Sequence, residues 1–287
     1  MTSAFPKLRA GIVLATAALA LVACSVGKLA YNNASPVVTY MVDDYFDLSG
    51  DQEDWVRARF GRLQAWHRAT ELPAYERDLR DAVRRTERPL TLEDARWVNK
   101  TLRSYYDRTV EQALPDMADL LLQLDAEQTA HFERRFAKES LKIEKETARG
   151  TAEERAEKRA DKMIDQIETY TGRLSKEQRA LVAQDVRTMV DVAYMRLADR
   201  IVRQELIVAM VRAKPPKAEL VAGLRKVLMQ TESWRKPEYT QALAKRDAQV
   251  ADMMVALSHT WTPEQRASVQ RKLRSYLSDV SSLIAVR

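Results

Sequence analysis

A short pattern that begins α-helices recurs along this chain and constrains its fold more than any other feature. An apolar residue precedes Ser, Thr or Asp, and Gln or Asp follows three residues later. In such a capping box the first side chain accepts a backbone N–H of the first helical turn, and the second accepts the N–H of the cap residue. The five cap and partner pairs are Ser49 and Gln52, Thr91 and Asp94, Asp125 and Gln128, Ser175 and Gln178, and Thr262 and Gln265.

These boxes predict five helix starts, and Thr151 with Glu154 forms a sixth box directly after Gly150. The spacing between the boxes is irregular, which excludes a solenoid of equal repeats. Glycine and proline number only 7 and 9 in 287 residues, and good helix formers dominate the rest. We therefore predict an all-α fold, a multi-helix bundle, in which Pro73 and Pro115 end or kink helices.

Two stretches indicate how the bundle is organised. Apolar residues recur at helical spacing over Lys176–Ala213 and cover a wide face, so we expect one long central helix there. Lys142–Lys162, in contrast, is dense in charge, and alanine every fourth residue is its only apolar stripe. We expect residues 138–172 to form a charged helical arm that projects from the body, with a disordered charged loop as the alternative.

The N-terminus has the pattern of an export signal. A basic start at Lys7 and Arg9 leads into an apolar run that is too short to span a bilayer. The run ends in Leu21, Val22, Ala23 and Cys24, and Cys24 is the only cysteine of the chain.

Those four residues resemble the lipobox of bacterial lipoproteins, in which the cysteine is lipidated, with palmitate among its acyl groups, and becomes the first residue. An ordinary secretory signal that contains a cysteine is the alternative. We expect residues 1–23 to be a removed signal peptide, 24–36 a flexible lipidated tether, and 37–287 the helical domain.

The residue after the cysteine bears on location. It is Ser25 rather than Asp, and by the same resemblance this implies the outer membrane. The body is then expected in the periplasm, although exposure at the cell surface stays open. The net charge of +6 is spread over many acidic and basic residues and forms no concentrated basic stripe, so we expect the membrane as a partner and no nucleic acid.

Catalytic and metal-binding motifs are scarce. The three histidines, His67, His131 and His259, lie far apart and outside any zinc-binding spacing. The best catalytic candidates are His67 and Glu71, four residues apart on one helix face, but a structural hydrogen bond explains such a pair as well. We therefore expect no enzyme activity, no metal and no cofactor, with a site assembled across distant helices as the alternative.

Two resemblances add to this. The sequences YNN at 31–33, DDY at 43–45 and WHRxxELPxY at 66–75 resemble a family of proteobacterial lipoproteins with a domain of unknown function, which implies export and a helical fold. The boxes that begin at Leu48, Leu174 and Trp261 are similar to the LTxxQ motif of the Spy/CpxP periplasmic chaperones, although helix capping alone also produces this pattern.

The expected function follows from the anchor and from these resemblances. We expect a chaperone-like binding module for unfolded or envelope polypeptides, and a structural component of an envelope complex is the alternative. The sequence does not indicate an oligomeric state.

Overall fold

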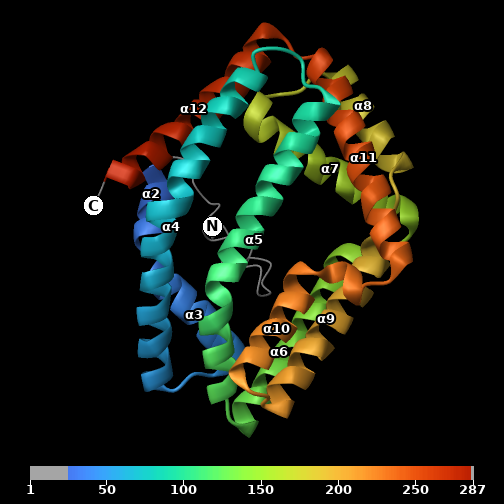
Figure 1. Cartoon of the computed structure of the whole chain (residues 1–287). Helices are drawn as coiled ribbons and strands as arrows, with labels where there is room; N and C mark the ends of the chain where they lie inside the picture. The colour runs from blue at the N-terminus through green and yellow to red at the C-terminus, as the bar shows by residue number, and fades with distance from the viewer. Residues whose placement is uncertain (1–24, 286–287) are drawn as a thin grey trace, which may run out of the picture.

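The computed structural model describes residues 25–285, and this part of the chain contains eleven α-helices and no strand, which confirms the all-α prediction (Figure 1). The signal peptide and the lipobox, Leu21 to Cys24, lie outside the described residues. The helices are α2 Ser25–Asn32, α3 Ala34–Phe46, α4 Gly50–Arg85, α5 Leu92–Gln123, α6 Ala126–Ile143, α7 Ala152–Thr171, α8 Lys176–Thr188, α9 Ala193–Ala213, α10 Lys217–Met229, α11 Pro237–His259 and α12 Pro263–Ala285. A π-helical turn, Glu144–Ala148, extends α6, and a 3₁₀ turn, Thr231–Ser233, precedes α11.

All six capping boxes form both of their hydrogen bonds. At the start of α4, for example, Ser49 N–H donates to Gln52 Oε1 at 3.0 Å, and Gln52 N–H donates to Ser49 Oγ at 3.4 Å. Each box stabilises its helix by about 1 kcal/mol because it satisfies N–H groups that have no partner inside the helix. The boxes therefore fix where α4, α5, α6, α7, α8 and α12 begin.

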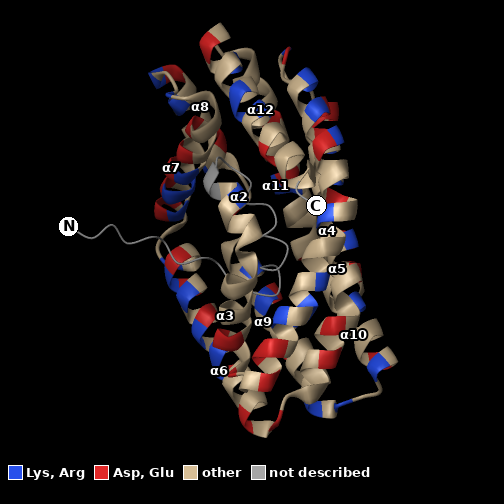
Figure 2. Cartoon of the chain, turned by 90° about the vertical axis from the view of Figure 1, so that its left-hand side faces the viewer, with Lys and Arg blue, Asp and Glu red and all other residues tan. Residues whose placement is uncertain are grey.

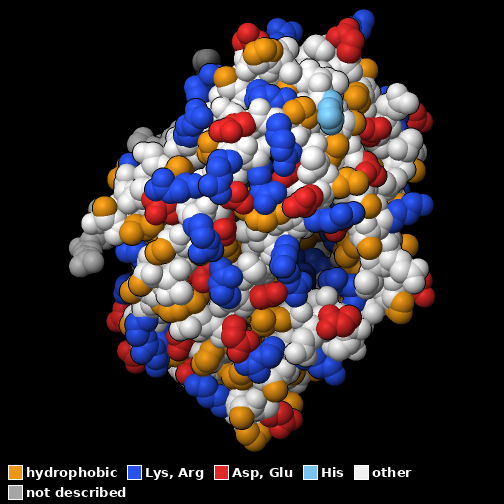
Figure 3. Space-filling model, turned by 45° about the horizontal axis from the view of Figure 1, so that its top comes forward, with side chains coloured by type: hydrophobic (Ala, Val, Ile, Leu, Met, Phe, Trp, Pro, Cys, Tyr) orange, Lys and Arg blue, Asp and Glu red, His pale blue; other side chains and the backbone are white. Residues whose placement is uncertain are grey.

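Two large apolar clusters hold the helices together. One lies between α3, α4, α5, α6, α9 and α10, and its fully buried members include Leu114 and Phe132. The other lies between α7, α8, α11 and α12, around Val182 and Leu257. The long helices α4 and α12 pack side by side along the left of Figure 1, while α5 packs against α10 in one half and α11 in the other. On the face shown in Figure 3, basic and acidic side chains are interleaved.

The expected central helix, Lys176–Ala213, is two helices. α8 ends at Thr188, Met189 adopts an extended backbone with ψ 143°, and α9 begins at Ala193. Asp191 in the break accepts the N–H of Ala193 at 3.1 Å and the guanidinium of Arg155 on α7 at 2.7 Å. The prediction was wrong because apolar residues continue through the break, where they are buried in the turn instead of along one helix face.

The two prolines expected to end or kink helices are also accommodated. α4 continues through Pro73 for 36 residues, and α5 continues through Pro115 for 32. A proline inside a helix removes one backbone hydrogen bond. Packing along both helices compensates: Leu72, immediately before Pro73, and Leu114, immediately before Pro115, are fully buried.

The expected projecting arm is part of the body. α7 packs against α8 and α12, and Ala148, Ala156 and Ala160 are buried. Small side chains let neighbouring helices approach closely, so the alanine stripe is a packing face. Acidic and basic residues are frequent along α6 and α7 (Figure 2), and those of α7 such as Glu157, Lys158 and Asp161 are exposed. Gly150, with φ 96°, provides the turn between the two helices.

Candidate functional site

The first described helices, α2 and α3, are docked onto the body by a buried polar network. Tyr31 on α2 is only 2% exposed, and its hydroxyl lies 3.1 Å from Nδ1 of His67 on α4. On the other side of the imidazole, Nε2 of His67 lies 3.2 Å from the hydroxyl of Tyr75. His67 is fully buried between these two tyrosines. We call Tyr31, Asn32, His67, Arg68 and Tyr75 the N-terminal clamp.

Burial keeps the rings of the clamp neutral. It lowers the pKa of His67 to about 4, partly offset by the charge of Glu71, and raises the pKa of Tyr31 to about 12. A neutral imidazole has one donor and one acceptor nitrogen, so one tyrosine hydroxyl donates to the ring and the other accepts from it. Both ring nitrogens are therefore occupied.

The outer part of the clamp uses Arg68. Its guanidinium donates to Asn32 Oδ1 on α2 at 2.8 Å and to the backbone carbonyl of Leu283 on α12 at 2.8 Å. Lys28 of α2 lies 3.5 Å from the carboxylate of Asp279, also on α12. Residues 25–36, expected as a flexible tether, are therefore helical apart from the turn at Asn33, and they are fixed to α4 and α12. The prediction missed this because the partners of Tyr31 and Asn32 lie more than thirty residues away.

Glu71, the other catalytic candidate, has a separate partner. It is fully buried, and Arg108 of α5 donates to both of its carboxylate oxygens at 2.8 and 2.7 Å. The tyrosine hydroxyls hydrogen-bond to both ring nitrogens of His67, and the guanidinium of Arg108 binds both carboxylate oxygens of Glu71. In the described part of the chain, the pair instead joins α2, α4 and α5.

Several large apolar side chains of α2 and α3 are exposed. Leu29, Val37 and Tyr40 are 63%, 56% and 70% exposed, although all three are large apolar residues. Between positions 29 and 40 no residue is charged, and the ribbon of α2 and α3 is tan along this stretch in Figure 2. We call Leu29, Ala30, Pro36, Val37 and Tyr40 the N-terminal apolar face.

Comparison with known proteins places the chain in a family. Residues 44–240 match a family of unknown function, DUF6279. This chain belongs to the DUF6279 family. The match includes His67, Glu71 and Tyr75, whereas Tyr31 and α12 lie outside it. Neither the curated proteins nor the solved structures gave a match.

Within this DUF6279 protein, the four boxes that carry glutamine have a second role. Oε1 of Gln178 caps α8, while its Nε2 donates to Gln265 Oε1 of the α12 box at 2.8 Å and to the carbonyl of Thr260 at 3.0 Å. Gln265 Nε2 donates back to Gln178 Oε1 at 2.8 Å. An amide can cap its own helix and donate to another at once, which a carboxylate cannot do.

The same arrangement joins α4 to α6. Gln128 Nε2 donates to Gln52 Oε1 at 2.6 Å and to the carbonyl of Asp47 at 2.9 Å. The six boxes were predicted from sequence, but the pairing of their glutamines was not. The available signal was the choice of Gln over Glu or Asp at the third helical position of four boxes.

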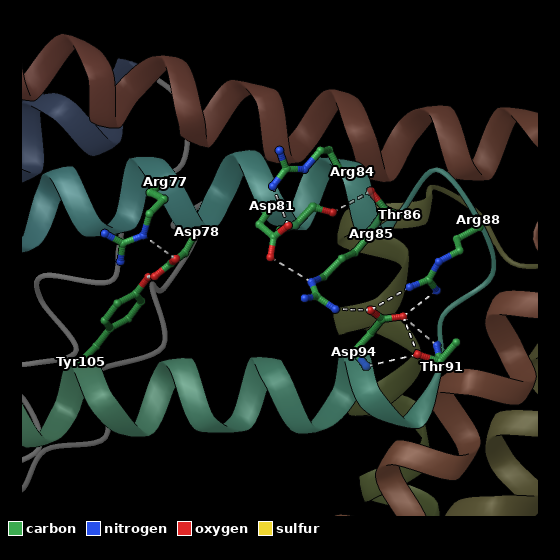
Figure 4. A network of polar contacts seen from close by, with 11 residues as sticks. Arg77, Asp78, Asp81, Arg84, Arg85, Thr86, Arg88, Thr91, Asp94 and Tyr105 are labelled. Atoms are coloured by element: carbon green, nitrogen blue, oxygen red, sulfur yellow. Dashed lines mark hydrogen bonds and ion pairs between the residues drawn. The ribbon is translucent and has the colours of Figure 1, made fainter.

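The acidic box at the start of α5 binds arginines instead. Asp94 is buried between Arg85 and Arg88, each 2.7 Å from one of its oxygens, where the end of α4 meets α5 (Figure 4). Burial alone would raise the pKa of Asp94, but hydrogen bonds from Arg88, Arg85 and Thr91 outweigh it and hold that pKa well below its usual range. This network fixes the turn between the two longest helices.

Two further findings concern residues 25–285. No group of three or more His, Cys, Asp or Glu side chains in this range is placed to hold a metal ion. No helix in the same range has the length and apolar character that crossing a membrane requires.

Proposed function

We propose that this DUF6279 protein is a lipoprotein, anchored to the outer membrane through Cys24, that binds envelope polypeptides in the periplasm without enzymatic activity. One observation carries the proposal, namely the exposed N-terminal apolar face. α2 begins at Ser25, directly after the lipobox cysteine, and the clamp fixes that helix to the body. A lipid on Cys24 would place the face beside the membrane surface.

The physical basis for binding is apolar area. Burying a side chain the size of Leu29 or Val37 contributes roughly 1.5–3 kcal/mol, and Tyr40 adds a hydroxyl that can hydrogen-bond at the edge of a contact. Large apolar side chains that stay exposed on neighbouring helices are a common mark of an interaction site. Exported polypeptides pass close to the membrane before they fold, and their exposed apolar segments fit such a face.

The similarity of the boxes to the LTxxQ motif supports this proposal only weakly. The glutamines of the boxes cap helices and pair with each other, so their side chains are already used inside the protein. We therefore assign polypeptide binding to the N-terminal apolar face and not to the boxes. A structural component with a single fixed partner is the competing function, since the same face could serve either.

Crosslinking in living cells tests the proposal. A photo-crosslinking amino acid is placed at Val37, and at the exposed Lys158 of α7 as the matched control. We expect many different envelope polypeptides to be captured from position 37 and few from position 158. A single captured protein would favour the structural function, and no capture from position 37 would refute both.

A further inference from the structure

A cavity of about 190 Å³, partly open to solvent, lies beneath α3, between α4 and α5. Its wall is almost entirely apolar. Its wall includes Val38 and Val42 of α3, Phe60 of α4, Ala113 and Met117 of α5, and Phe132 of α6. This site is separate from the N-terminal clamp and from the exposed face, although α3 contributes to both the cavity and the face.

The pocket is partly open to solvent, so part of its apolar wall has no protein atoms packed against it. Interiors are close-packed, and the atoms around a void lose contacts with neighbours. Water fills such a space poorly, because a well-held water needs two to four polar partners and this wall offers few. Small side chains such as Ala113 and Val38 leave the space open, where larger ones would close it. An apolar ligand would restore the lost contacts.

The edge of the cavity is charged. Arg59 and Asp116 are the two charged residues in its wall, and their side chains are 33% and 34% exposed, so they lie where the wall meets solvent. Arg59 and Arg62 share the carboxylate of Asp116 at 3.5 and 3.6 Å, distances longer than a close ion pair. Asp116 balances only one of the two arginines, so one positive charge is in excess. Both guanidiniums can also turn toward an anion.

Charges farther from the edge do not change this balance. The nearest acid on the same helix is Asp119, and Lys217 neutralises it at 2.7 Å. Arg59 also lies over the ring of Trp55 at 4.9 Å, which holds its guanidinium beside the cavity. The edge is thus suited to a negatively charged group and the interior to a hydrocarbon.

We propose that this cavity binds a small single-chain amphiphile, with its hydrocarbon tail beneath α3 and its anionic head at Arg59 and Arg62. A cavity of about 150 Å³ accepts benzene, so 190 Å³ accommodates a tail of about six to eight carbons. The head is a carboxylate or a phosphate. This inference rests on the cavity and its charged edge and is independent of the proposed polypeptide binding.

The test uses the purified full-length protein with octanoate and octyl phosphate as probes, and octanol as a neutral probe with the same tail. Calorimetry should show one binding site for at least one of the two anionic probes, and that probe should raise the melting temperature. Octanol should bind at least tenfold more weakly. Absence of binding by both anionic probes at millimolar concentration would overturn the proposal.

Two variants locate the site. Ala113→Leu fills the cavity and should abolish binding of the anionic probes while the protein stays folded. Arg59→Gln should weaken the anionic probes about tenfold and leave octanol unchanged. Arg77→Gln, an exposed arginine of the same helix away from the cavity, is the matched control and should bind like the wild type. Unchanged binding in both Ala113→Leu and Arg59→Gln would place the ligand elsewhere and refute the assignment.

Discussion

The paired glutamines of the α8 and α12 boxes allow a sharp test of how helix starts are joined. In Gln178→Glu the carboxylate still caps α8, because it accepts the N–H of Ser175 that Oε1 accepts at 2.9 Å. It can no longer donate to Gln265 Oε1 or to the carbonyl of Thr260, which lie 2.8 and 3.0 Å from Nε2 in the wild type. A buried carboxylate would then face two acceptor oxygens.

The expected cost follows from those two contacts. Each of the two lost hydrogen bonds contributes ~1 kcal/mol, and a buried acceptor left without a donor adds ~1–3 kcal/mol, so we expect Gln178→Glu to destabilise the protein by about 3–5 kcal/mol. Urea unfolding followed by circular dichroism measures this difference as a lower midpoint. Part of the loss should return as the pH falls, because a protonated carboxyl group can donate again.

Glu154→Gln is the matched control. Glu154 belongs to the acidic box of α7, is exposed, and accepts only the N–H of Thr151, at 2.8 Å. The change conserves that acceptor and should alter stability by less than ~0.5 kcal/mol. If Gln178→Glu were as stable as Glu154→Gln, the amide pair would not hold α8 and α12 together, and the second role assigned to the glutamines would be wrong.

Three further predictions concern the N-terminal region. Tyr31→Phe leaves one nitrogen of the buried His67 without its partner and should cost ~1–2 kcal/mol, whereas Tyr40→Phe, at an exposed position, should leave the urea midpoint unchanged. The folded state lowers the pKa of His67 from 6.5 to about 4, so the unfolded state binds the proton first; the stability that neutral His67 contributes is present above pH 6.5 and is lost as the pH falls toward 4. His67→Gln should flatten that part of a stability–pH curve, and an unchanged curve would contradict the assignment. Labelling with a palmitate analogue should tag the wild type and not Cys24→Ser, and equal labelling would refute lipidation.

The helix starts could be predicted from sequence because capping is local. Ser175 and Gln178 lie three residues apart, and their pattern is sufficient to define where a helix begins. The pairing of Gln178 with Gln265 could not be predicted, since it joins residues that are 87 positions apart and depends on how the helices pack. The contact between Tyr31 and His67 in the candidate site likewise joins residues far apart in the sequence. Both belong to the resemblance noted from sequence, but only the fold brings them together.

The two errors in architecture have different causes. Apolar periodicity continues across residues 189–192, so it cannot distinguish one long helix from two helices joined by a buried turn. The alanine stripe of α7 is visible in the sequence, but alanine is only weakly apolar, so the stripe indicated a projecting arm and not a packing face. Ala156 and Ala160 bury little area themselves, yet their small size lets the backbone of a neighbouring helix come close, and this depends on the neighbour.

The clamp determines how a pull on the N-terminus would pass through the protein. α2 is attached near the middle of α4, at His67 and Arg68, and Arg68 also holds the last turn of α12. α4 has 36 residues and is therefore about 54 Å long. If Cys24 carries a lipid, mechanical load from the membrane would enter at the midpoint of this helix and be shared by α12. Because α2 is fixed to the body, the body would then move together with its lipid anchor and not at the end of a flexible linker.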